Sequence, residues 1–143
     1  MEEEVLIQSM TEADYDAAVS LWSATTGIGL SAADERENIR RYLERNANLS
    51  LVAVKDGAMI GAVLCGHDGR RGYLHHLAVA ASYRGKGIGR RLVAECVKRL
   101  ADENIDRCHV FVFPDNEQGL AFWREVGFPK RNDILLCSHD IQR

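Results

Sequence analysis

The segment that most constrains this fold is residues 77–90, where a β-like run passes through a glycine-rich turn into a long amphipathic helix. The helix is expected from Gly87 to about Glu103, because its apolar residues recur at helical spacing. The members of this stripe are Ile88, Leu92, Val93, Cys96, Val97 and Leu100. The next β-rich run is 106–113, and two strands joined by a helical crossover lie parallel in one sheet. We therefore expect a sheet with helices packed on it.

The other β-like and helical runs predict one mixed α+β domain spanning residues 1–143. Further strands are expected at 5–10, 49–55, 58–66, 73–79 and 134–138, and further helices at 11–22, 31–45 and 116–125. The dipeptide Asp56-Gly57 suits a type I′ turn, so the strands beside it form a hairpin. Gly127 suits a left-handed helix cap. The expected architecture is a central, largely antiparallel sheet of six or seven strands with helices on both faces.

Charge and composition exclude several classes of partner. The formal net charge is −3, so no broad basic surface attracts nucleic acid or an anionic membrane. The start, Met1–Glu4, lacks the basic and apolar regions of a signal peptide, and no apolar run approaches the ~20 residues that span a bilayer. The four cysteines lack CxxC spacing, which predicts reduced thiols and no metal site. We expect a cytoplasmic protein without nucleic-acid or membrane partners.

The turn at 84–90 has the chemistry of an anion site. Small residues let backbone N–H groups approach phosphate oxygens, and the N-terminus of a helix adds a partial positive charge. Arg84, Lys86 and Arg90 add full positive charges. The glycines at 85, 87 and 89 alternate, which matches neither the Walker pattern nor the dinucleotide fingerprint GxGxxG. The segment therefore predicts a pyrophosphate site of another type.

The pattern Arg-x-x-Gly-x-Gly at 84–89 resembles that of the GNAT superfamily of N-acetyltransferases. The similarity continues upstream through the strand at 74–79 and downstream through Asn116 and residues 121–128, which look like the family's second motif. Together with the order of strands and helices, it covers nearly the whole chain. The resemblance implies acetyl-CoA as cosubstrate and transfer of its acetyl group to an amine.

The resemblance also implies where the cofactor binds. Backbone N–H groups from Gly85 to Arg90 would hold the coenzyme A pyrophosphate, and backbone groups of Leu77 and Val79 would pair with pantetheine amides. Splaying near the middle of the sheet, between the strands that end at Val79 and Phe113, would open a V-shaped slot for the thioester. The implied cofactor-binding residues are Leu77, Ala78, Val79, Arg84, Gly85, Lys86, Gly87, Ile88, Gly89, Arg90, Asn116, which would contact the pantetheine arm, and Trp123.

Candidates for proton transfer lie on the strand at 73–79, since acyl transfer needs a group that accepts the amine proton near neutral pH. Alternate side chains of a strand share a face, so Tyr73 and His75 lie together and His76 lies on the opposite face. His75 is the preferred base, because an imidazole titrates near pH ~6.5. Tyr73 is an alternative that would orient water. A base role for His76, and a structural role for either histidine, stay open.

Two positions depart from the family's pattern. Many members carry a tyrosine that protonates the departing thiolate where this chain has Trp123, whose indole lacks an acidic proton. The strand Val110–Phe113 lacks the glutamate base that some members place there, and its Phe111 and Phe113 predict an apolar slot wall. A non-catalytic acyl-CoA-binding module is therefore an alternative function. A protein that binds ATP phosphates at the same turn is another.

The acceptor is expected to be a primary amine of a small molecule or a peptide. The loop at 27–34, the first two helices and the turn around Asp68 would select it, because such surface segments vary on a fixed scaffold. Asp34, Glu35 and Asp68 would attract a cationic amine, or serve as solvated caps and turns. A homodimer is one option for the assembly.

Overall fold

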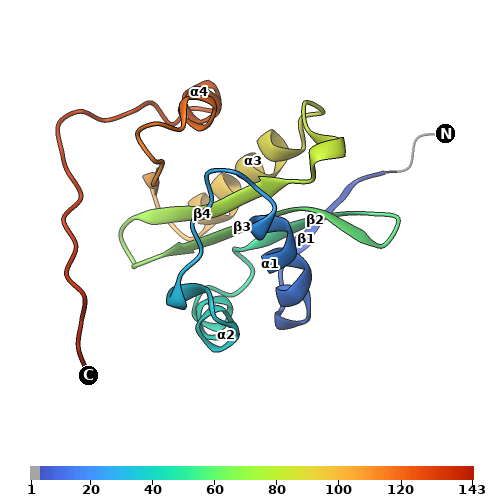
Figure 1. Ribbon diagram of the computed structural model, residues 1–143, viewed down its shortest axis with the longest axis horizontal. Helices are drawn as coiled ribbons and strands as arrows, with labels where there is room; N and C mark the ends of the chain where they lie inside the picture. The colour runs from blue at the N-terminus through green and yellow to red at the C-terminus, as the bar shows by residue number, and fades with distance from the viewer. Residues whose placement is uncertain (1–3) are drawn as a thin grey trace.

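The computed structural model describes residues 4–143 and contains one five-stranded sheet in the order β1-β2-β3-β4-β5 (Figure 1). The strands are β1 (Leu6–Ser9), β2 (Leu51–Lys55), β3 (Ala58–His67), β4 (Gly72–Val79) and β5 (Cys108–Val110). Neighbours pair antiparallel as far as β4, and β4 pairs parallel with β5. The antiparallel meander and the parallel crossover are thus confirmed. The acidic start Met1–Glu3, judged above not to be a signal peptide, lies outside the described residues.

The α-helices are α1 (Tyr15–Ser23), α2 (Arg36–Arg45), α3 (Ile88–Asp102) and α4 (Glu117–Glu125). Short 3₁₀ turns precede three of them: η1 (Glu12–Asp14), η2 (Ala32–Asp34) and η3 (Ala81–Tyr83). Figure 1 shows α1 and α2 on one side of the sheet and α3 on the other. Each face therefore has its own apolar core.

The apolar stripe predicted for α3 builds the first of these cores. Ile88, Leu92 and Leu100 are buried against β2, β3 and β4. On the opposite face Trp22 and Ile39 pack with Ala62 and other small residues of the sheet. Burial of this apolar surface on both faces holds the meander between two helical layers.

Local turn chemistry behaves as the sequence predicts. Asp56 and Gly57 both have positive φ, 54° and 76°, as a type I′ turn requires. The sequence Thr11-x-x-Asp14 predicts a capping box, and the box is present: the Thr11 backbone N–H donates to the Asp14 carboxylate at 2.8 Å. Gly127 follows α4 with a φ of 103°, in the left-handed region.

Within residues 4–143 the sheet has five strands, fewer than the six or seven expected. The strand predicted at 106–113 is reduced to β5, because only Gly72–Leu74 of β4 pairs with it. Residues 134–138 form no strand, and all of 129–143 is exposed, with Leu135 at 91%. A β-like pattern becomes a strand only where a neighbour supplies hydrogen bonds, and this tail runs away from the body of the protein (Figure 1).

Candidate cofactor and acceptor site

The turn between β4 and α3 has the backbone of an anion site. Gly85 and Gly87 have φ of 76° and 83°, a region that side chains rarely adopt, and Gly87 is the N-cap of α3. Within residues 4–143, no heavy atom beyond the adjoining residues lies within 4 Å of the Cβ position of either glycine, so the turn has room for a ligand. The first N–H groups of a helix have no intrahelical acceptor, and no acidic residue occupies the first turn of α3. Backbone donors and a positive helix terminus therefore face open space together.

Three cationic side chains surround this turn, and all are exposed. Arg84 donates from Nε to the Val79 carbonyl at 2.9 Å, so it folds back over the end of β4. The Lys86 ammonium lies 5.6 Å from the ring centre of Tyr83. Arg90 forms a loose ion pair with Glu125 at 3.6 Å. Ile88 differs from these, because its side chain is buried in the core and only its backbone faces the turn.

The C-terminal half of β4 borders the expected slot, which is the side of residues 75–79 that no strand of the described chain pairs with. The parallel pairing with β5 ends at Leu74 opposite Val110, and β4 continues for five residues without a strand partner on that side. On its other side, Ala78 and Val79 stay paired with Ala62 and Gly61 of β3. One edge of residues 77–79 therefore has no strand partner and leads directly to the glycine turn, where Arg84 donates to the Val79 carbonyl.

Near the β5 side of this slot, the loop between α1 and α2 meets the start of α4. The Cβ position of Gly27 is 2.8 Å from Nδ2 of Asn116, and that of Gly29 is 3.4 Å from the ring of Phe113. Asn116 caps α4, because its Oδ1 accepts from the Gly119 N–H at 3.0 Å. A cavity of about 540 Å³ lies between the two segments, lined by both glycines, Phe113 and Asn116.

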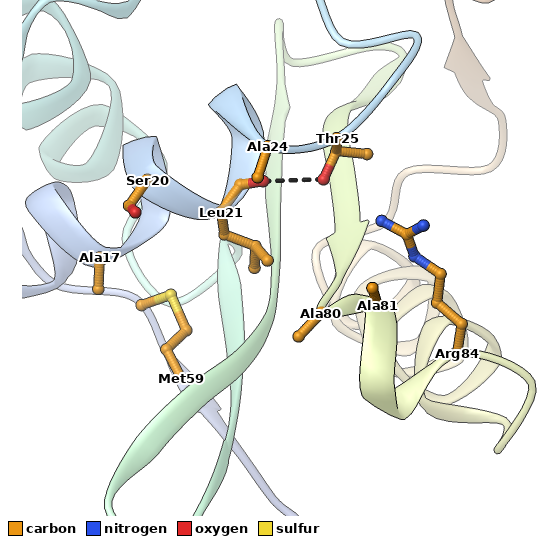
Figure 2. A pocket seen from close by; sticks show the side chains of 9 residues that line it. All are labelled: Ala17, Ser20, Leu21, Ala24, Thr25, Met59, Ala80, Ala81 and Arg84. Carbon is orange, nitrogen blue, oxygen red and sulfur yellow. Dashed lines mark hydrogen bonds between the residues drawn. The ribbon is translucent and has the colours of Figure 1, made fainter.

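A second cavity of about 410 Å³ lies between α1 and the β4–α3 turn. Leu21 and Met59 supply its largest apolar side chains, and Arg84 reaches over it from the turn toward Thr25 (Figure 2). Thr25 is held in place because its hydroxyl donates to the Leu21 carbonyl at 2.8 Å. One cationic side chain thus borders both this cavity and the glycine turn.

The predicted pair Tyr73 and His75 lies together on the face covered by α1 and α2. Their rings are stacked at 6.4 Å with an interplanar angle of 7°, and Phe111 stacks at 5.9 Å from His75. Burial lowers the pKa of His75, and the neighbouring His76 lowers it further, whereas Asp34 opposes the shift. His75 is thus neutral at pH 7, the form that accepts a proton.

The expectation that His76 lies on the opposite face is wrong. Two residues of β4, His76 and Leu77, lie opposite the single residue Val63 of β3, which makes a β-bulge. His76 has a φ of 56°, and its ring lies 5.2 Å from that of Trp22 in α1. The bulge breaks the alternation of side chains, so both histidines face the α1 and α2 layer.

Sequence reasoning also left Asp34 undecided between an amine site and a solvated cap. Asp34 is buried, at 9% exposure, and its Oδ1 lies 2.9 Å from His76 Nε2. Asp68 by contrast accepts from the N–H groups of Arg70 and Arg71 within its own turn. The pattern Ser31-x-x-Asp34 predicts a capping box, and no local signal reveals the contact with a strand 42 residues away.

Trp123 is part of an aromatic cluster. Its ring lies 5.2 Å from Phe122 and 5.2 Å from Phe128, edge to face in both cases. The cluster packs against the α3 core, and Phe122 in turn lies 3.4 Å from the Cβ position of Gly89. Gly89 therefore allows α4 to approach the start of α3.

Residues 4–143 contain neither a candidate metal site nor a candidate membrane span. This part of the chain contains no group of three or more His, Cys, Asp or Glu side chains that could hold a metal ion. Among the helices described, none has the length and apolar character needed to cross a membrane.

Comparison with known proteins agrees with this geometry. The acetyltransferase (GNAT) family profile matches residues 15–128. An acetyltransferase of Pectobacterium atrosepticum is 28% identical over 130 residues, covering 91% of this chain and 92% of that protein. The PaiA N-acetyltransferase of Thermoplasma acidophilum, solved with coenzyme A, superposes with a TM-score of 0.74 at 21% identity, over 87% of this chain and 89% of that one.

A further structural relative is an aminoglycoside acetyltransferase from an uncultured soil metagenomic sample, solved in complex with sisomicin. It superposes with a TM-score of 0.76 at 15% identity, over 96% of this chain and 97% of that one. The chain thus shares its fold with acetyltransferases of known structure. The chain belongs to the acetyltransferase (GNAT) family, and acetyl-CoA is its cosubstrate.

Proposed function

We propose that this enzyme transfers the acetyl group of acetyl-CoA to a primary amine of a small molecule or peptide by direct attack within a ternary complex. The observation that carries the proposal is the unpaired edge of residues 77–79, which runs into the left-handed turn at Gly85 and Gly87. An extended pantetheine arm with amide groups fits such an edge as an added strand would. The pyrophosphate then lies at the start of α3.

Side chains around the turn complete the proposed cofactor site. Arg84, Lys86 and Arg90 add charge to the backbone donors of Gly85–Arg90, which favours a doubly charged pyrophosphate. In this proposal Asn116, at the N-cap of α4, and Trp123, within α4, also contact the cofactor. The Asn116 carbonyl is committed to its helix cap, so its amide nitrogen is the group left for the pantetheine arm.

For the chemical step, we propose His75 as the proton acceptor and Tyr73 as its stacking partner. His75 lies one residue beyond the last β4–β5 pair, at the apex of the slot, where the thioester would end. The lowered pKa keeps its imidazole neutral at pH 7. The amine nitrogen attacks the thioester carbonyl carbon, His75 takes the amine proton, and the C–S bond breaks to release coenzyme A as a thiolate.

Departure of the thiolate needs no tyrosine in this scheme. A thiol titrates near pH ~8.5, so its anion is a tolerable leaving group at neutral pH. Holding the amine and thioester in line supplies much of the acceleration, because effective molarities of about 10⁵ M and above are possible for aligned reactants.

The test is a steady-state assay of coenzyme A release from acetyl-CoA with a panel of amines. The panel contains aminoglycosides, polyamines, amino acids and peptides, because two aminoglycoside acetyltransferases share this fold. We expect at least one amine to give turnover and an acetylated product of matching mass. Binding of acetyl-CoA without turnover across the panel would instead support the non-catalytic acyl-CoA-binding module.

A further inference from the structure

Asp34 and His76 form a partly buried pair that joins the acceptor-side loop to the centre of β4. The Oδ1 atom of Asp34 lies 2.9 Å from Nε2 of His76, and the two side chains are only 10% and 18% exposed. Asp34 itself is held from two sides. Its Oδ2 accepts from the Ser31 N–H at 3.0 Å, and its backbone carbonyl accepts from the Tyr15 hydroxyl at 2.6 Å. The carboxylate therefore has one fixed position relative to α1 and η2.

His76 has a backbone conformation that needs such support. Its φ of 56° lies in the left-handed region, which is unfavourable for a residue with a Cβ and persists only when surrounding contacts hold it. The contacts available are the Asp34 carboxylate and the Trp22 ring at 5.2 Å. Both act on the imidazole, so the side chain of His76 anchors its own backbone.

The orientation of His75 depends on that conformation. The bulge places the rings of His75 and His76 6.4 Å apart on one side of the sheet, at the apex of the slot. If His76 relaxed to ordinary extended geometry, the alternation of side chains would return and the path of the backbone at 75–76 would change. Ala78 and Val79 would keep their partners on β3, so the cofactor edge would remain in register.

We propose that Asp34 is a positioning residue for the acetyl-transfer reaction: it anchors His76 in the bulge and thereby aims His75 at the apex of the slot. The proposal rests on the function proposed above for His75. Asp34 touches neither substrate in this scheme and acts through His76.

The decisive variant is Asp34→Ala, compared with Asp14→Ala as a matched control. Asp14 also closes a capping box at a 3₁₀ turn, with Thr11 in place of Ser31, and has no histidine partner. We expect Asp34→Ala to lower kcat about 10- to 100-fold, because a small misplacement of a reacting group has effects of that size. The KM for acetyl-CoA should stay unchanged. Asp14→Ala should keep wild-type kcat, and equal losses in the two variants would overturn the proposal.

Substitutions of His76 separate positioning from general packing. His76→Asn should retain most of the kcat, because asparagine tolerates a left-handed φ and its amide can donate to Asp34. His76→Gly should lose as much as Asp34→Ala, and the double variant should lose no more than either alone. Additive losses would show that the two residues act independently and would contradict the anchor.

An activity-independent measurement distinguishes this proposal from the proposed function. Nuclear Overhauser contacts between the His76 and Trp22 rings should be present in the unliganded wild type and absent in Asp34→Ala. If they persist in the variant, the anchor is wrong whatever the activity. If they disappear in the variant but the wild type acetylates no amine, the anchoring of His76 by Asp34 is supported and the proposed catalytic function is wrong.

Discussion

The two halves of β4 are built in different ways, although both border the same slot. The C-terminal half and the following turn present backbone groups: the free edge of 77–79 and the N–H groups at the start of α3. The bulge in the middle presents side chains, His75 and His76, whose directions depend on Asp34 and Trp22 from other elements. The proposed cofactor end is thus locally encoded, whereas the proposed reactive centre is assembled from distant parts of the chain.

This difference predicts different sensitivities to substitution. A backbone site tolerates changes of side chain but fails when a glycine is replaced, because its function needs positive φ and open space. A side-chain site tolerates changes around it but fails when one ring or its anchor is removed. The four predictions below, from the largest expected effect to the smallest, test this contrast.

The largest effect is expected for Gly87→Glu at the N-cap of α3. A side chain at φ 83° is strained, and a carboxylate there would repel the pyrophosphate. Coenzyme A at 100 times its Kd should stabilise the wild type by about 2.7 kcal/mol, and the variant should show no thermal shift. Gly69→Glu is the control, because Gly69 has a similar φ of 94° in the remote β3–β4 turn. A thermal shift that persists in Gly87→Glu would show that the pyrophosphate does not bind at this turn.

His75→Ala should lower kcat/KM about 100-fold, the usual loss for a catalytic proton acceptor. In the wild type burial lowers the pKa of His75, so the acid limb of the pH profile should begin at lower pH than that of an ordinary histidine. The measurement is the ratio of wild-type to variant kcat/KM as a function of pH, with the same acceptor for both enzymes. Titration of the acceptor amine affects both enzymes equally and therefore cancels in this ratio. His109→Ala, which removes a ring beside Tyr73, serves as the control. A ratio near one throughout would make His75 structural.

Trp123→Tyr should lower stability by about 1 to 3 kcal/mol and leave kcat unchanged. The smaller ring leaves space in the cluster with Phe122 and Phe128, and packing losses of that size follow such substitutions. Chemical denaturation and steady-state kinetics measure the two quantities separately. A kcat that rises severalfold would instead mean that protonation of the thiolate limits the present enzyme.

The smallest effect is expected for Gly27→Ala in the loop that meets α4. Its Cβ would lie 2.8 Å from the Asn116 amide at a φ of 91°, which should destabilise the fold by about 1 to 2 kcal/mol. Gly29→Ala is the matched control, since its Cβ would lie 3.4 Å from Phe113, close to ordinary contact. Equal Tm values for the two variants would show that the loop moves freely against Asn116.

Several elements followed from the sequence alone, because their determinants are local. The turn at Asp56 and Gly57, the capping box at Thr11 and the apolar stripe of α3 all depend on residues within a few positions. The glycine-capped start of α3 is also encoded by neighbouring residues. The proposed pyrophosphate site and the resemblance to the family both depend on this segment. Side-chain type and spacing are enough to predict a feature when the interacting groups are close together in the chain.

Tertiary structure alone decided the bulge at His76, the burial of Asp34 and the number of strands. A register shift depends on which β3 residues pair with β4, and that pairing reversed the predicted side of His76. The sequence left Asp34 open between an amine site and a solvated cap, and its contact with His76 forms only when η2 packs beside the strand. The β-like pattern at 134–138 found no neighbouring strand to supply hydrogen bonds. Each of these features depends on contacts between residues far apart in the chain, which local propensity does not encode.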